Sequence, residues 1–105
     1  MLVMILCHDK PDGGPIRAAN RDDHLRYVTG AGDRLKLAGP IQSTDGQGPE
    51  GGARPVGSLL IIEAASLEAA RLFADNDPYR KAGVFADVEV RPFKGVLGAW
   101  LPDAG

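Results

Sequence analysis

The chain has 105 residues, of which 44% are hydrophobic and 25% charged, so it suits one folded domain and is too hydrophobic for a disordered segment. Its 12 basic and 14 acidic residues give a formal net charge of -2, which leaves no basic excess for binding nucleic acid. The single cysteine, Cys7, excludes an intrachain disulfide and a cysteine metal cluster, and it favours a cytoplasmic location.

The first predicted element is a strand. Leu2–Cys7 is a continuous apolar run of strand length, which is typical of a central strand covered on both faces. The run is too short to span a membrane, and no signal-peptide cleavage site follows it. Turn-forming residues fill Pro11–Pro15, and apolar residues then recur with a helical period, so we expect a loop followed by a helix over Arg17–Gly32.

A short strand and a long loop are predicted next. Leu35–Ala38 alternates in hydrophobicity, and we expect this strand to end at Gly39 and Pro40 because proline restricts the residue before it. Nine of the nineteen positions from 39 to 57 are glycine or proline, which is too many for a packed element. The segment is therefore interpreted as a long surface loop.

The second half of the chain predicts a strand, a helix and a strand. The strand is the apolar run Ser58–Glu63, and the helix follows Ser66, whose side chain can accept a hydrogen bond from a backbone N–H. This helix should end at Asn76–Pro78, since the residue before a proline is driven out of the helical region. Phe85–Phe93 alternates apolar and charged residues, and Pro92 implies an edge strand or a strand end.

The predicted order is strand, helix, strand, strand, helix, strand, which is typical of an α+β ferredoxin-like fold (β-α-β-β-α-β) with an antiparallel sheet. Helices cover one face of such a sheet, and a second protomer packing sheet to sheet would cover the other, so we expect a homodimer. Residues 1–95 form the predicted domain and 96–105 a C-terminal tail. Trp100 in this tail should pack on a surface or a partner.

Two residues are candidates for proton transfer. His24 lies beside Leu25 and Val28 on the first predicted helix, where it flanks the buried stripe and suits a half-buried base; a surface or packing role is the alternative. Asp77 precedes Pro78. Its side chain could either close an Asx turn or orient a histidine.

Other residues are candidates for contacts with a ligand. Ser58 begins a strand without a GxSxG nucleophile motif, so it is a possible hydrogen-bond donor or an ordinary strand-end serine. Tyr79 could pack or donate its hydroxyl, and Gly39 with Pro40 could allow close backbone approach or simply form a turn. The spacing of His and Cys matches no metal motif, and no phosphate-binding loop is present, so we expect neither a metal nor a cofactor.

Several short motifs occur in an order that covers nearly the whole chain. They lie at residues 23–25, 37–40, 57–58, 66–70, 75–79, 82–85 and 90–94. Together they resemble the YciI-like family, also described as YCII-related or DGPF-type domains. The resemblance implies a dimeric ferredoxin-like α+β barrel whose cleft holds a His-Asp pair. Members include a dehydrochlorinase that acts on a chlorinated hydroxyhydroquinone.

The resemblance places the His-Asp pair at His24 and Asp77, with Ser58 nearby. It implies a cofactor-independent lyase or isomerase in which His24, oriented by Asp77, moves a proton on an unknown small molecule. A non-catalytic module that binds a small metabolite in the same cleft is the alternative. A third hypothesis is an accessory protein that acts through the tail around Trp100.

Overall fold

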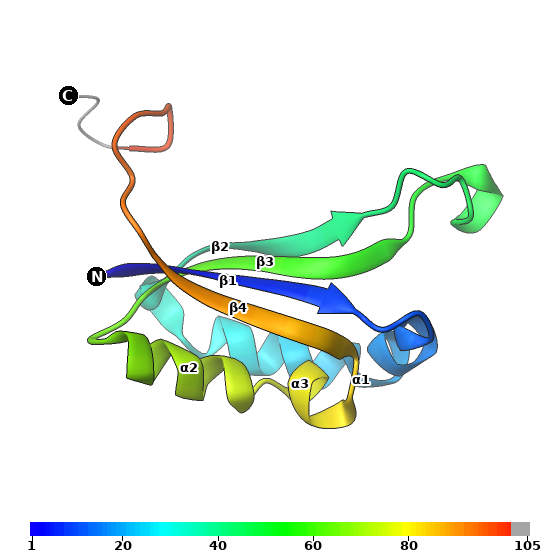
Figure 1. Cartoon of the computed structure of the whole chain (residues 1–105), viewed down its shortest axis with the longest axis horizontal. Coiled ribbons are helices and arrows are strands. Elements are labelled where there is room, and N and C mark those ends of the chain that lie inside the picture. Colours follow the sequence, from blue (N-terminus) through cyan, green and yellow to red (C-terminus); the bar gives the residue numbers. More distant parts are fainter. Residues whose placement is uncertain (102–105) are drawn as a thin grey trace.

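A four-stranded antiparallel sheet with helices on one face makes up the computed structural model, which describes residues 1–101 (Figure 1). The elements in chain order are β1 (Leu2–Asp9), α1 (Gly13–Thr29), the short 3-10 helix η1 (Gly32–Arg34), β2 (Leu35–Gln42), η2 (Pro49–Gly51), β3 (Pro55–Glu63), α2 (Leu67–Asp75), α3 (Pro78–Ala82) and β4 (Phe85–Phe93). The strand order β2-β3-β1-β4, with every neighbouring pair antiparallel, confirms the ferredoxin-like fold.

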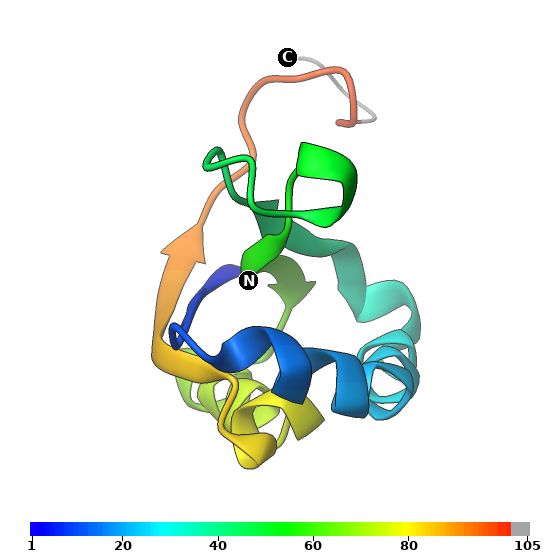
Figure 2. The ribbon, with the colours of Figure 1, turned by 90° about the vertical axis from the view of Figure 1, so that its right-hand side faces the viewer.

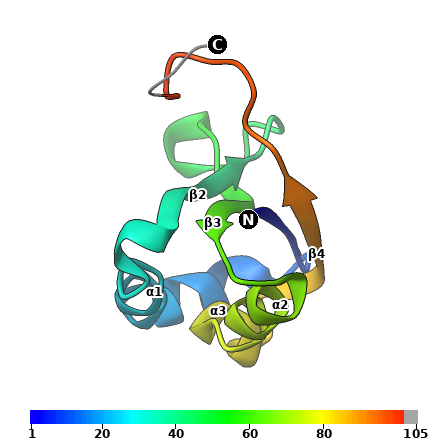
Figure 3. The same cartoon turned by 90° about the vertical axis from the view of Figure 1, so that its left-hand side faces the viewer.

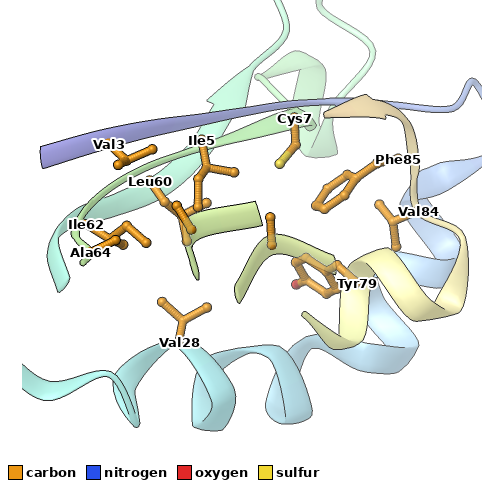
Figure 4. Packing of buried hydrophobic residues seen from close by; sticks show 12 residues of the cluster. Val3, Ile5, Cys7, Val28, Leu60, Ile62, Ala64, Tyr79, Val84 and Phe85 are labelled. Atoms are coloured by element: carbon orange, nitrogen blue, oxygen red, sulfur yellow. The ribbon is translucent and has the colours of Figure 1, made fainter. Parts of the chain in front are cut away.

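The core lies between the sheet and the helices (Figure 4). Alternate side chains of a strand point to opposite faces of the sheet. The side chains of β1 that face the helices are buried, namely Val3, Ile5 and Cys7. The side chains between them are half-buried on the other face, namely Leu2, Met4 and Leu6. Within one chain, β1 is therefore covered on only one of the two faces that its apolar run predicted.

Helix α1 begins at Gly13 rather than at Arg17 as predicted. Pro15 lies in the first turn of the helix, where backbone N–H groups have no acceptor within the helix. Although proline has no N–H, the helix therefore loses no hydrogen bond at this position. Tyr27 joins α1 to α2, because its hydroxyl donates to the carbonyl of Phe73 over 2.7 Å and the two rings stack. The end view in Figure 3 shows α1 beside α2 and α3 on the same side of the sheet.

The long loop predicted over residues 39–57 is shorter in the structure, and the prediction is wrong at both ends of the loop. Gly39 and Pro40 do not end β2 but lie within it, where Pro40 pairs with Ser58 of β3. Strand β2 is at the edge of the sheet, and an edge strand tolerates proline because its missing N–H can face solvent. Pro55 opens β3, a position that proline also tolerates. The connection is thereby reduced to residues 43–54.

The chain after β3 follows the prediction with one addition. Helix α2 is capped as predicted, since Oγ of Ser66 accepts from the N–H of Ala69 over 3.0 Å. The unexpected element is α3, which begins directly after Asp77, with Pro78 as its first residue. Proline at the first helical position is favourable, so Pro78 ends one helix and also starts the next. Gly83 ends α3 with a φ of 85°, a left-handed conformation that favours glycine.

Strand β4 has the predicted bounds and pairs only with β1, which agrees with the edge position implied by Pro92. The segment after β4 and the β2–β3 hairpin both project from the sheet on the side away from the helices (Figure 2). Trp100 is 82% exposed, so it packs on no surface of its own chain, and residues 102–105 of the predicted tail lie outside the described residues. None of the helices in residues 1–101 is long and apolar enough to cross a membrane.

Candidate functional site

A cleft of about 500 Å³ opens beside α1 and the strands β2 and β3. This volume is within the usual range for small-molecule sites. Each residue predicted to contact a ligand lines it, namely Gly39, Pro40, Ser58 and Tyr79. His24 lines it as well, together with the apolar side chains of Leu25 and Val28. A smaller hollow of about 220 Å³ lies beside Lys10 and Arg54 and contains no histidine.

The structure brings His24 and Asp77 together although 53 positions separate them. Nδ1 of His24 lies 2.7 Å from Oδ1 of Asp77, and the two side chains are only 12% and 5% exposed. A carboxylate can only accept a hydrogen bond, so Nδ1 carries a proton, and in the neutral imidazole Nε2 is then an acceptor. Nε2 makes no hydrogen bond to the part of the chain that the structure describes, and its ring lines the cleft.

Asp77 itself lies behind the imidazole rather than in the cleft wall. The oxygen that holds His24, Oδ1, also accepts from the backbone N–H of Tyr79 over 2.9 Å, which caps α3. The two alternatives that the sequence left open for Asp77, an Asx-type turn and the orientation of a histidine, therefore occur together.

The ring of Tyr79 fixes the orientation of the imidazole plane of His24. Its ring is 3% exposed and stacks on the ring of His24, with centroids 3.9 Å apart and planes within 5°. Phe85 of β4 meets the ring of Tyr79 edge-on, with centroids 6.1 Å apart. Burial raises the pKa of the Tyr79 hydroxyl, although the positive charge of Arg17 opposes the shift, so Tyr79 stays a neutral phenol. Its ring lines the cleft, and stacking is the role that its contacts define.

Arg17 is a cleft residue that the sequence reasoning missed. Its Nε and Nη2 each lie 2.9 Å from a carboxylate oxygen of Asp9, and Nη2 also donates to the carbonyl of Gly57 and to Oγ of Ser58, both over 2.8 Å. Burial lowers the pKa of the guanidinium, but the hydrogen bond and charge of Asp9 more than offset this and raise it. One feature of the sequence could have indicated Arg17 as a candidate, because residues 17 and 24 are two turns apart on one face of the helix.

Other reactive groups contribute little to the cleft. Burial, with a smaller effect of the Asp77 charge, raises the pKa of the Cys7 thiol to about 12, so this thiol is not a nucleophile near neutral pH. Across residues 1–101, His, Cys, Asp and Glu nowhere gather in the groups of three that a metal site needs. The cleft therefore offers His24, arginine and hydroxyl groups for its chemistry.

Comparison with known proteins shows relatives over almost the full length. The YCII-related domain matches residues 1–94. Protein YciI of Escherichia coli is 44% identical over 99 residues, which cover 92% of this chain and 100% of that protein, and an uncharacterized protein of Haemophilus influenzae is 40% identical with the same coverage.

A solved structure is also similar in fold and sequence. It is the 5-chloro-2-hydroxyhydroquinone dehydrochlorinase of Burkholderia phenoliruptrix, in complex with 2,5-dihydroxybenzoquinone. The TM-score is 0.79 and the sequence identity 34%, and the match covers 90% of this chain and 94% of that one.

Proposed function

Because this chain belongs to the YCII-related domain family, we propose that it is a cofactor-independent enzyme that removes a proton from a small hydroxylated substrate in an elimination or isomerisation. The observation that carries the proposal is the 2.7 Å contact between Nδ1 of His24 and Oδ1 of Asp77 at the wall of the cleft. The 34% identity to a dehydrochlorinase supports an elimination that releases a proton and chloride.

In the proposed step, His24 acts as the general base. Nε2 takes the proton, and the carboxylate of Asp77 stabilises the imidazolium that forms. The electron pair of the broken bond to hydrogen forms a new π bond in the substrate. In an elimination the bond to the leaving group breaks and chloride departs with its electron pair; in an isomerisation the proton returns at another carbon. Neither route changes the oxidation state of the protein.

The walls of the cleft suit a small ring. Leu25, Val28 and Pro40 supply apolar surface, while His24 and Ser58 supply polar groups at defined points. Small-molecule sites typically combine a largely apolar lining with a few placed polar groups. Since the base is oriented by Asp77 and stacked on Tyr79, little reorganisation is needed before the proton moves.

The test measures chloride release from 5-chloro-2-hydroxyhydroquinone by the purified protein. We expect His24→Ala to lower kcat by about 10²- to 10⁴-fold, which is the usual contribution of a general base. His8→Ala is the matched control, because His8 is exposed at the end of β1 and does not line the cleft, and it should keep the wild-type kcat. Full activity of His24→Ala would refute the proposed mechanism. Substrate bound tightly but recovered unchanged would favour the non-catalytic binding module.

A further inference from the structure

The cleft is much longer than a single ring. Helix α1 lines it from Gly14 to Thr29, and these two positions are separated by about 22 Å along the helix axis. A ring with two hydroxyl groups spans less than half of this distance. His24 lies between the two ends, and the cleft wall continues past it for about 7.5 Å to Thr29. A single ring that reacts at His24 therefore leaves this far end of the cleft unfilled.

The part of the cleft past His24, called the apolar end below, is lined almost entirely by hydrocarbon. Three elements contribute to it, namely α1 with Leu25, Val28 and Thr29, β2 with Leu35 and Ala38, and β3 with Leu60. Ala38 is paired with Leu60 across the two strands, so both side chains lie on the helix-facing side of the sheet. Val28 points from α1 toward this side of the sheet (Figure 4). The strands form the floor of the apolar end and α1 forms its wall.

The apolar end offers no free side-chain donor among the residues that line it. Thr29 is its one polar side chain, and the Thr29 hydroxyl hydrogen-bonds to the backbone carbonyls of Leu25 over 2.7 Å and of Arg26 over 3.3 Å. Leu25 is 40% exposed and Ala38 is exposed as well, so apolar surface at this end is in contact with water. Covering such surface with an apolar group of a ligand is favourable.

We infer that the apolar end binds an apolar substituent, such as a short alkyl chain, on the ring that reacts at His24. The substrate is then a hydroxylated ring that carries an apolar substituent. A charged or hydroxylated substituent is disfavoured there, because it would lose its water without gaining a hydrogen-bond partner. The inference rests on the proposed function for the position of the ring, and it adds the class of substrate to that proposal.

Ala38 is the residue that sets the room available at this end. Its side chain is a single methyl group on the edge strand β2, and no helix covers it. A phenylalanine at this position would occupy the space above Leu60 that the substituent requires. The edge strand tolerates the change, since aromatic residues favour strands. Ala38→Phe should therefore remove the preference for a substituted ring.

Binding of resorcinols with alkyl chains of increasing length tests the inference. Resorcinol, 4-ethylresorcinol and 4-butylresorcinol share one dihydroxylated ring and carry no leaving group, so calorimetry measures binding without elimination. Each added carbon should raise the affinity of the wild-type protein about threefold. In Ala38→Phe the ratio of the affinities for 4-butylresorcinol and resorcinol should fall at least about tenfold. Ala69→Phe makes the same change at an exposed residue of α2 outside the cleft, and it should keep the wild-type ratio.

Equal affinities of the wild-type protein for the three compounds would overturn the inference, and so would a gain with chain length that Ala38→Phe leaves intact. The first result is the one expected if a second copy of the chain already covers the apolar end. Ala38→Leu decides the matter in the same way if Ala38→Phe fails to fold.

His24→Ala separates this inference from the proposed function. The gain with chain length should persist in this variant, because the apolar end lies past the imidazole. If the gain persists there together with full turnover, the base is refuted and the apolar end stands. If turnover is lost in His24→Ala but the wild-type protein binds all three compounds equally, the apolar end alone is refuted.

Discussion

At the scale of single residues, one oxygen atom connects the backbone to the candidate base. Oδ1 of Asp77 accepts both from the N–H of Tyr79, in the first turn of α3, and from Nδ1 of His24. The ring of Tyr79 then stacks on the same imidazole. The start of a five-residue helix therefore sets both the position and the plane of His24. A change at Asp77 acts on helix stability and on the imidazole at once, and the two effects require different variants to separate them.

The variants Asp77→Asn and Asp77→Ala separate the effect on helix stability from the effect on the imidazole. Asparagine keeps an oxygen that can cap α3 but loses the charge that stabilises an imidazolium, whereas alanine loses both. We expect Asp77→Ala to lower the free energy of unfolding by about 1–2 kcal/mol and Asp77→Asn by much less, as measured by urea denaturation. Both variants should lower kcat at least about a hundredfold. Wild-type kcat in Asp77→Asn would mean that Asp77 serves only as a helix cap.

At the scale of elements, the sequence predicted those segments whose signals are local. The alternation in β4 and the Ser66 cap of α2 each lie within a few residues, and both elements have the expected form. Strand β2 was predicted too short because Pro40 locally favours a break. That preference is overridden by the edge position of β2, which depends on how the strands are ordered in space.

The residues of the cleft likewise depend more on contacts between distant segments than on local signals in the sequence. His24 and Asp77 could be paired from the sequence only through the family resemblance, because the contact spans 53 positions. Arg17 could not be selected, since its spacing to His24 does not distinguish it from Arg21, which lies three positions before the same histidine on the same helix. Its burial depends on Asp9 and on the carbonyl of a glycine 40 positions away. Burial of a charged side chain is a property of the folded chain.

Gly57 of β3 shows how closely two central strands must approach. A Cβ at this position would lie 2.4 Å from the carbonyl oxygen of Cys7 in β1, and a backbone atom cannot move aside easily. We expect Gly57→Ala to lower the free energy of unfolding by about 2–3 kcal/mol, as measured by urea denaturation. Gly39→Ala is the control, because a Cβ in this strand glycine would meet nothing within 4 Å. An equal effect of both substitutions would contradict this explanation.

At the scale of the whole molecule, the sheet presents an apolar face away from the helices. Alternate residues of two central strands contribute to it, namely Leu2, Met4 and Leu6 of β1 and Leu59 and Ile61 of β3. The edge strands add Leu37 and Phe93, which are 39% and 48% exposed. Beside them, β4 places the charged side chains of Glu89 and Arg91 opposite Leu6 and Met4, at the border of this face. An apolar patch with a charged border of this kind marks a surface that another molecule covers. We propose that a second copy of the chain packs its sheet against this face, as the family resemblance implies.

Ile61→Glu tests this dimer at the centre of the face, where Ile61 is paired with Met4 on one side and Leu37 on the other. A charge buried there without a partner strongly opposes association, so we expect the wild-type protein to sediment with the mass of two chains and the variant with the mass of one. Leu72→Glu introduces the same charge on α2, at a side chain that is 58% exposed on the helix side, and it should remain a dimer.

The oligomeric state and the cleft can then be separated. Ser58 and Leu60 line the cleft and alternate along β3 with Leu59 and Ile61, so the cleft and the apolar face lie on opposite sides of one strand. A folded monomer of Ile61→Glu should therefore release chloride from 5-chloro-2-hydroxyhydroquinone with a kcat within about threefold of the wild-type value. Loss of this activity in a monomer with wild-type secondary structure by circular dichroism would show instead that the partner chain completes the cleft. A wild-type protein that sediments as a monomer would contradict the dimer itself.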